Sequence, residues 1–331
     1  MRSGLSGAGK CGAVRVIVLP LLLLIAPVAC VGQYAPSAGQ DHDSESFRIK
    51  VDVALVVLHA TVTDRRGVLV SNLGRQDFEV YEDGLPQHIR LFRDEDIPVT
   101  VGLVVDHSTT MRPKLAEVTA AALTFARSSN REDEMFVVNF NEKVSLGLPG
   151  TIRFTNSTAE LKNAITAAPA GGETALYDAI AKGLEELEAG GRDKKVLIVV
   201  SDGGDNASRH SLAQVMELAR QSSAVIYTIG IFDEEDPDRN PGVLKRLAAE
   251  TGGEAFFPDQ LSQAVAICAR IARDIRHQYT IGYVPINPAR DGTYRAIRVL
   301  ARAKGHGRLS VRTRTGYIAG AEPGINEKGA R

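Results

Sequence analysis

The 331-residue chain is 44% hydrophobic and 24% charged, with a formal net charge of -1. This composition is typical of a globular protein with room for two domains. The balanced charge argues against a nucleic-acid-binding protein, which would present a basic face. Two of the three cysteines, Cys11 and Cys30, lie in the first thirty residues, and only Cys268 remains in the body. We therefore expect no internal disulfide in the mature chain, and a buried structural thiol at Cys268.

Residues 1–30 are typical of an export signal. Basic residues precede the apolar stretch Val16–Ala29, which is shorter than the roughly 20 residues that a membrane span needs. The sequence Pro27-Val28-Ala29-Cys30 resembles the lipidation box of bacterial lipoproteins. We expect an exported protein that is periplasmic, anchored to the cell envelope through a lipid on Cys30, or secreted. Plain cleavage and an uncleaved anchor are the alternatives, and any membrane attachment would be through the N-terminus.

Residues 31–46 are small and polar, which predicts a flexible tether. Residues 47–98 then indicate short antiparallel strands, over Arg48–Thr63, Phe78–Tyr81 and Gln87–Phe92, with a turn at Asp83-Gly84.

Residues 99–276 alternate apolar strands with helical patterns, which predicts a doubly wound, mostly parallel α/β sheet of the Rossmann-like kind. The expected strands after Val99–Val105 are Met135–Phe140, Val144–Leu148 (an antiparallel edge strand), Val196–Val200 and Val225–Ile231. The expected helices are Leu115–Arg127, Leu161–Ala167, Ala175–Leu187, Leu212–Arg220, Val243–Glu250 and Leu261–Ile275.

Residues 277–318 return to a β pattern, with strands expected over Tyr279–Tyr283, Tyr294–Ala301 and Leu309–Arg314, before a tail at residues 319–331. Neither β segment has enough strands to cover its own apolar face. We therefore expect residues 47–98 and 277–318 to pair into one small β-sandwich, into which the α/β domain is inserted. Two separate β modules are the alternative.

Oxygen-bearing side chains follow two of the predicted parallel strands. Val99–Val105 is followed by Asp106, Ser108 and Thr110, and Val196–Val200 by Ser201 and Asp202. A glycine turn, Gly171-Gly172, brings a further hydroxyl at Thr174. Ligands bind outside the carboxyl ends of strands in open α/β sheets, and hard oxygen ligands suit Mg²⁺, Mn²⁺ or Ca²⁺ better than zinc or copper. The sequence predicts a divalent cation at this edge.

At these residues the chain resembles the von Willebrand factor A family, whose metal-ion-dependent adhesion site (MIDAS) reads Asp-x-Ser-x-Ser, then a distant Thr, then a distant Asp. The resemblance covers about residues 99–276, with Thr110 in place of the last serine. It implies direct metal binding by the hydroxyls of Ser108 and Thr110. It also implies binding by Thr174 directly or through water, and by Asp106 and Asp202 mainly through water. The flanking segments, such as Ile281-Gly282-Tyr283, look like an exported bacterial subfamily of A-domain-related proteins.

Other candidate sites are less specific. The seven histidines show no zinc spacing, and we expect His107 to point outward. The acidic run Asp233–Asp238 lacks the glycine and terminal glutamate of a calcium loop, so we interpret it as a solvated loop.

These features predict an exported, adhesion-type, metal-dependent protein-binding module rather than an enzyme. The cation would accept an Asp or Glu carboxylate of a protein partner, and the loops at Arg112, Lys114 and Asn206–His210 would supply specificity. One alternative is a metal-dependent hydrolase on the same doubly wound fold, with Glu173 or Asp205 as general base. The other is a structural envelope protein that holds no metal.

Overall fold

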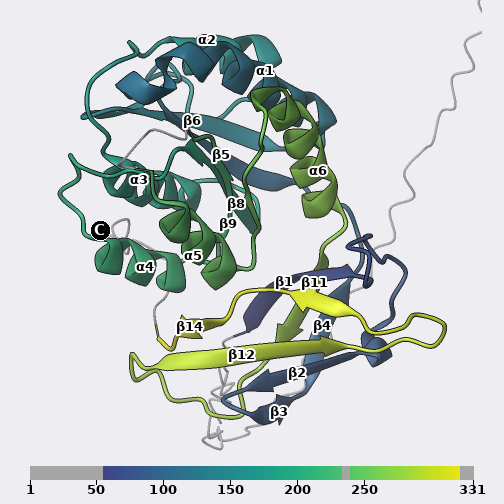
Figure 1. Cartoon of the computed structure of the whole chain (residues 1–331). Helices are drawn as coiled ribbons and strands as arrows, with labels where there is room; N and C mark the ends of the chain where they lie inside the picture. The colour runs from purple at the N-terminus through teal and green to yellow at the C-terminus, as the bar shows by residue number, and fades with distance from the viewer. Residues whose placement is uncertain (1–54, 233–238, 321–331) are drawn as a thin grey trace, which may run out of the picture. The chain divides into compact units, whose positions relative to one another are not determined.

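A six-stranded sheet forms the centre of the α/β segment, in the strand order β10-β9-β8-β5-β6-β7. Figure 1 labels its four central strands, β9, β8, β5 and β6. The computed structural model describes residues 55–232 and 239–320. The predicted export signal, Cys30, the tether and the acidic run Asp233–Asp238 lie outside these residues. The sheet consists of β5 (Val99–Asp106), β6 (Glu134–Phe140), β7 (Val144–Leu146), β8 (Lys194–Ser201), β9 (Val225–Gly230) and β10 (Ala255–Phe256).

The strands of this sheet are parallel except for β7, which pairs antiparallel with β6, as the short turn between them predicts. All positions of β5 and β8 are buried, because helices cover both faces of the sheet. The two-residue strand β10 was not predicted, because its pattern is too short to recognise.

Six α-helices in the described part of the chain cover the two faces of the sheet (Figure 1). Helices α1 and α6 pack together on the face that carries Leu103 and Val105, whereas Gly183 of α3 meets Val104 on the opposite face. The helices are α1 (Leu115–Ser128), α2 (Thr158–Thr166), α3 (Leu176–Glu188), α4 (Leu212–Gln221), α5 (Pro241–Thr251) and α6 (Ala264–Arg276). Short 3₁₀ helices precede α1 (Thr109–Lys114) and α6 (Leu261–Gln263). No helix among the described residues has the length and apolarity to cross a membrane.

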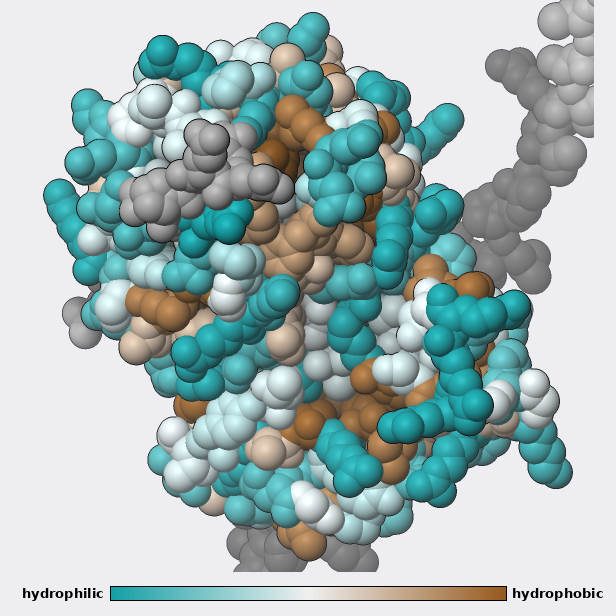
Figure 2. Space-filling view, in the orientation of Figure 1, coloured by the Kyte–Doolittle hydropathy of each residue, from teal (hydrophilic) through white to brown (hydrophobic). Residues whose placement is uncertain are grey.

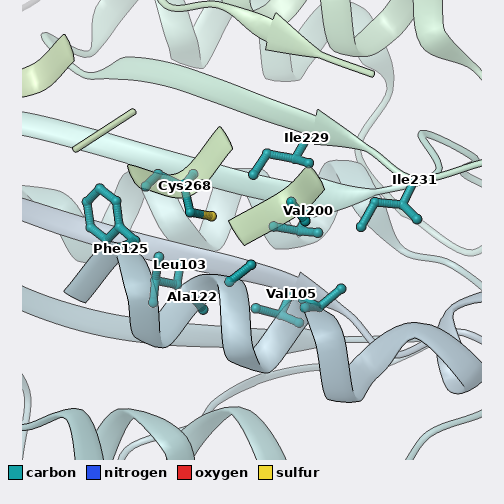
Figure 3. A pocket seen from close by; sticks show the side chains of 12 residues that line it. Leu103, Val105, Ala122, Phe125, Val200, Ile229, Ile231 and Cys268 are labelled. Atoms are coloured by element: carbon teal, nitrogen blue, oxygen red, sulfur yellow. The ribbon is translucent and has the colours of Figure 1, made fainter. Parts of the chain in front are cut away.

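Apolar side chains from α1, α6 and the sheet converge beneath α6 (Figure 3). Phe125 and Ala122 of α1 face Cys268 of α6 and Ile229 of β9, around a void of about 10 Å³. A void of this size holds about one water molecule, so the region is packed core rather than a ligand pocket. Burial raises the pKa of the Cys268 thiol to about 12, and the prediction of a buried structural thiol is confirmed.

The remaining strands form two four-stranded sheets, ordered β13-β1-β11-β4 and β14-β12-β2-β3. Leu58 of β1 pairs with Ile281 of β11, and Val80 of β2 pairs with Val299 of β12. Each sheet therefore combines strands from both sides of the α/β segment, and one apolar core lies between them. The predicted fold class is confirmed. The strands are β1 (Val56–Thr63), β2 (Phe78–Glu82), β3 (Leu85–Gln87), β4 (Ile89–Arg93), β11 (Tyr279–Tyr283), β12 (Tyr294–Ala301), β13 (Ser310–Arg312) and β14 (Gly316–Ile318), with a 3₁₀ turn at Arg75–Asp77.

One predicted strand is divided in the structure, and another is followed by a strand, β14, that was not predicted. The segment Gln87–Phe92 was predicted as one strand, but the chain leaves one sheet after β3 and enters the other at β4. Leu309–Arg314 contributes β13 to one sheet, and the chain then reaches the other sheet at β14. Gly316 permits this second crossing, because a Cβ atom there would lie 2.3 Å from the carbonyl oxygen of Arg295. Alternating hydrophobicity reports which residues face a core and does not report a change of sheet.

Buried charged side chains lie where α6 leads into β11. Lys194, at the start of β8, is 2% exposed, and its ammonium group donates a hydrogen bond to the carbonyl of Ile275. Burial lowers the pKa of Lys194 to about 7, although Asp96, Asp274 and Asp133 act in the opposite direction. Arg312 of β13 forms ion pairs with Asp274 of α6 and, at 2.6 Å, with Glu254.

Candidate functional site

Two neighbouring strands of the central sheet place Asp106 beside Ser201. β5 and β8 run parallel with Val105 opposite Val200, so the residues that follow lie at the same edge of the sheet. The Asp106 side chain is fully buried, and its Oδ2 accepts a 2.6 Å hydrogen bond from the Ser201 hydroxyl. Ser201 was not among the predicted site residues.

The loop after β5 brings two more hydroxyls to this point. The amide of Ser108 donates to Asp106 Oδ1 at 2.8 Å, which turns the chain sharply after the strand. Ser108 Oγ lies 3.2 Å from Thr110 Oγ1, and Thr110 Oγ1 donates to Asp202 Oδ2 at 2.6 Å. Four of the five residues predicted as metal ligands are thus joined in one hydrogen-bonded chain, which passes through the backbone amide of Ser108.

The fifth predicted residue, Thr174, is held nearby through its backbone. Its amide donates to Asn206 Oδ1 at 2.8 Å, and its carbonyl accepts from the amide of Asn206 at 3.0 Å. The preceding Gly172 carbonyl accepts from both the amide and the hydroxyl of Thr109. Gly171 and Gly172 have φ values of 138° and 92°, which favour glycine and allow this loop to approach the loop after β5. Three loops therefore meet at one edge of the sheet.

The site contains two buried carboxylates, Asp106 and Asp202. Burial raises the pKa of Asp106 to about 6, and the nearby Asp202 adds to this effect, whereas hydrogen bonds from Ser201 and Ser108 oppose it. No group of three or more histidine, cysteine or acidic side chains placed to hold a metal occurs in the described part of the chain. A cation here would therefore depend on hydroxyl oxygens as well as carboxylates, a donor set that favours magnesium-like ions over zinc.

The prediction that His107 points outward is wrong. His107 is 2% exposed, and its Nε2 lies 3.1 Å from Oδ1 of Asn139 in β6. The amide of His107 donates to Phe140, so the pairing with β6 continues one residue past β5 and the side chain turns inward. Burial lowers the pKa of His107. Asn139 is a polar residue between the apolar Val138 and Phe140 of β6, and this is the sequence signal that points to a buried polar partner.

The surrounding loops contain the residues predicted to give specificity. Arg112 Nη2 donates to the carbonyl of Ala170 at 2.8 Å and so braces the glycine turn. Lys114, however, is buried, with its Nζ 3.4 Å from the carbonyl of Ile231, so it does not belong to an exposed rim. Its prediction as a specificity residue is wrong because the 3₁₀ helix directs the side chain inward.

The two predicted general bases differ in their surroundings. Asp205 Oδ1 accepts hydrogen bonds from the Ser208 hydroxyl at 2.5 Å and from the amide of Tyr177 at 3.2 Å. These bonds tie the loop after β8 to the start of α3, which is a structural role. Glu173 is exposed on the glycine turn.

The open, mostly parallel α/β sheet, with carboxylates and hydroxyls at its strand ends, has the architecture of a known domain family. Residues 100–267 match the von Willebrand factor type A domain. The chain belongs to this family.

The individual relatives have low sequence identity to this chain. The uncharacterized protein sll0103 of Synechocystis is 26% identical over 178 residues, which is 52% of this chain and 40% of that protein. The chain thus matches less than half the length of this relative. Among solved structures, a von Willebrand factor type A protein from Catenulispora acidiphila has a TM-score of 0.48 at 13% identity, covering 84% of this chain and 78% of its own. BatB from Bacteroides thetaiotaomicron has a TM-score of 0.42 at 17% identity, covering 53% and 98%.

Proposed function

We propose that this protein is an exported, metal-dependent protein-binding module. The observation that carries the proposal is the hydrogen bond between Thr110 Oγ1 and Asp202 Oδ2 at 2.6 Å, which joins the loop after β5 to the loop after β8. It brings two predicted ligands from distant parts of the sequence to one point. Export rests on the sequence of residues 1–30, with Cys30 as the proposed lipidation site.

The donor set fits a hard divalent cation. Asp106, Ser108, Thr110, Thr174 and Asp202 offer carboxylate and hydroxyl oxygens, the ligands that Mg²⁺ prefers. Two carboxylates buried close together repel one another, and a bound dication would offset that repulsion. These residues would hold Mg²⁺, or Mn²⁺ or Ca²⁺ in its place.

The cation, when bound, supplies a Lewis acid that accepts a carboxylate oxygen from an Asp or Glu side chain of a protein partner. The residues of this chain then act as the frame around that contact. Arg112 fixes the glycine turn, and Asn206 fixes Thr174 on the other side. Exposed side chains on these loops, including Glu173 and Arg209, would discriminate between partners.

Calorimetric titration of the chelator-treated protein with Mg²⁺, Mn²⁺ and Ca²⁺ tests the proposal. We expect saturable binding in the wild type, loss of binding in Asp202→Asn, and unchanged binding in Asp259→Asn, which alters an exposed acid far along the chain. Equal titrations of wild type and Asp202→Asn would contradict the assigned ligands. A second arm screens immobilised acidic peptides with Mg²⁺ and with chelator, because partner binding must depend on the metal.

A further inference from the structure

Among the strands that the structure describes, β12 has an open edge along half of its length. On one side it pairs with β2 over Ile297–Ala301, and on the other it pairs with β14 only over Tyr294–Ala296. From residue 298 onward, the described strands therefore provide β12 with a neighbour on one side only. An open edge leaves backbone groups available to another strand.

The hydrogen bonds on either side identify which backbone groups face this open edge. The amide of Ile297 donates to Thr315 at 2.7 Å on the β14 side, whereas the amide of Arg302 donates to Asp77 at 2.8 Å on the β2 side. Peptide groups alternate between the two sides of a strand, so Val299 and Ala301 point the same way as Ile297. Their N–H and C=O groups are directed away from β2, toward the open edge.

This edge borders a groove with a volume of about 830 Å³. Strand β13 forms the opposite wall, and within residues 55–232 and 239–320 it pairs with β1 alone. Ala303, Leu309 and Val311 line the groove and are only partly buried, although they pack against the core of the sandwich. Figure 2 shows apolar surface in the lower half of the view, where Figure 1 places β12, with hydrophilic side chains beside it.

The rim of the groove is strongly basic. Four exposed arginines line it: Arg65, Arg298, Arg302 and Arg308. The acid in the lining, Asp64, already accepts hydrogen bonds from Arg66, and Arg302 has a 3.4 Å contact with Glu79 that is largely exposed to solvent. The excess of positive charge is local, since the whole chain has a net charge of -1.

We propose that this groove is a second binding surface, which takes an extended, acidic segment of another protein as an added strand beside β12. Side chains of a strand alternate between its two faces. Apolar residues of the segment would cover Ala303, Leu309 and Val311, and acidic residues on the other face would meet Arg298 and Arg302. Backbone hydrogen bonds to Val299 and Ala301 would supply affinity that does not depend on the sequence of the added segment.

The alternative role for the same arginines is to prevent aggregation, because charge on an open edge opposes pairing with another strand. A binding experiment on the full chain separates the two. The probe is a short capped peptide of alternating valine and glutamate, compared with the same peptide carrying lysine in place of glutamate. We expect saturable binding of the glutamate peptide that is unaffected by chelator, and no binding of the lysine peptide.

Charge reversal locates the binding. The double variant Arg298→Glu/Arg302→Glu should weaken binding of the glutamate peptide by about tenfold or more, which corresponds to about 1.4 kcal/mol. Arg90→Glu is the matched control, because Arg90 is an exposed arginine on β4, at the edge of the other sheet of the sandwich. Equal affinity in wild type and the double variant, with melting temperatures unchanged, would overturn the proposal.

Amide hydrogen exchange tests the added strand itself and does not depend on any variant. Saturation with the glutamate peptide should slow exchange at Val299 and Ala301, which face the groove, and leave Arg298 and Leu300 unchanged because β2 already protects them. Slowed exchange confined to the loops around Asp106 and Thr174 would place the peptide at the other site and contradict a groove on the sandwich.

Discussion

Ser201 ends strand β8 and donates a 2.6 Å hydrogen bond to Oδ2 of Asp106, which ends the neighbouring strand β5. The same hydroxyl accepts a bond from the amide of Gly203 at 3.1 Å. One serine therefore orients a buried carboxylate and shapes the turn that carries Asp202. It supports the proposed cation site without being one of the proposed ligands.

We expect Ser201→Ala to destabilise the protein by about 1–3 kcal/mol, because the buried Asp106 loses a hydrogen-bond donor. Urea unfolding followed by circular dichroism measures the change. Ser145→Ala is the control, since Ser145 is exposed on β7 and its hydroxyl has only a 3.5 Å contact with a carbonyl, so its effect should stay within about 0.5 kcal/mol. Similar losses in both variants would contradict the role assigned to Ser201.

Thr110 provides a test of the hydroxyl ligand. Thr110→Val keeps the shape of the side chain and removes the group that donates to Asp202. At metal concentrations about one hundred times the dissociation constant, Mg²⁺ should stabilise the wild type by about 2.7 kcal/mol, and this gain should vanish in Thr110→Val. Thermal melts with Mg²⁺ and with chelator measure it.

Two further variants complete the Thr110 test. Thr110→Ser should retain the metal-induced stabilisation, because it keeps the hydroxyl. Thr119→Val should also retain it, since the Thr119 hydroxyl bonds to Leu115 within α1, away from the site. A full metal response in Thr110→Val would remove Thr110 from the ligand set.

The burial of Lys194 predicts that the free energy of unfolding depends on pH. Burial lowers its pKa from 10.5 to about 7, so between these values the unfolded chain binds more protons than the native one. The contribution of Lys194 to the free energy of unfolding is therefore largest above pH 10.5 and decreases as the pH falls toward 7. We expect the free energy of unfolding to rise between pH 7.5 and pH 9.5 within that window, and to rise less in Lys194→Met. Parallel curves for the two proteins would contradict this assignment.

The strand pairing predicts how fragments behave. Within residues 47–98, β2 pairs with β3, whereas β1 and β4 both pair with β11 from the other end of the chain. A fragment of residues 47–98 should therefore give no cooperative melt, while residues 99–276 should fold alone around the central sheet. Thermal melts and amide spectra of both fragments measure this, and a cooperative transition of residues 47–98 would refute the shared sandwich.

The fold was largely predictable because buried strands and amphipathic helices leave strong periodic patterns. The meeting of Asp106 with Asp202 was predictable from a parallel sheet, because Asp106 ends β5 and Asp202 follows the neighbouring strand β8. Hydrogen bonds across the sheet were not predictable, because neither the link from Ser201 to Asp106 nor the inward turn of His107 has a local pattern. Such contacts depend on which strands are neighbours and on the register between them.

The interleaved sandwich also bears on how the chain reaches its native state during synthesis. Tyr279 of β11 accepts a hydrogen bond from the amide of Leu73, which lies 206 positions earlier in the chain. The first β strands leave the ribosome long before their partners, and the complete α/β segment emerges between them. Because domains fold as they are synthesised, the central sheet has time to form first and then hold the two ends of the sandwich close together. The inserted domain would thus act as a folding template that shortens the search of the early strands for the late ones.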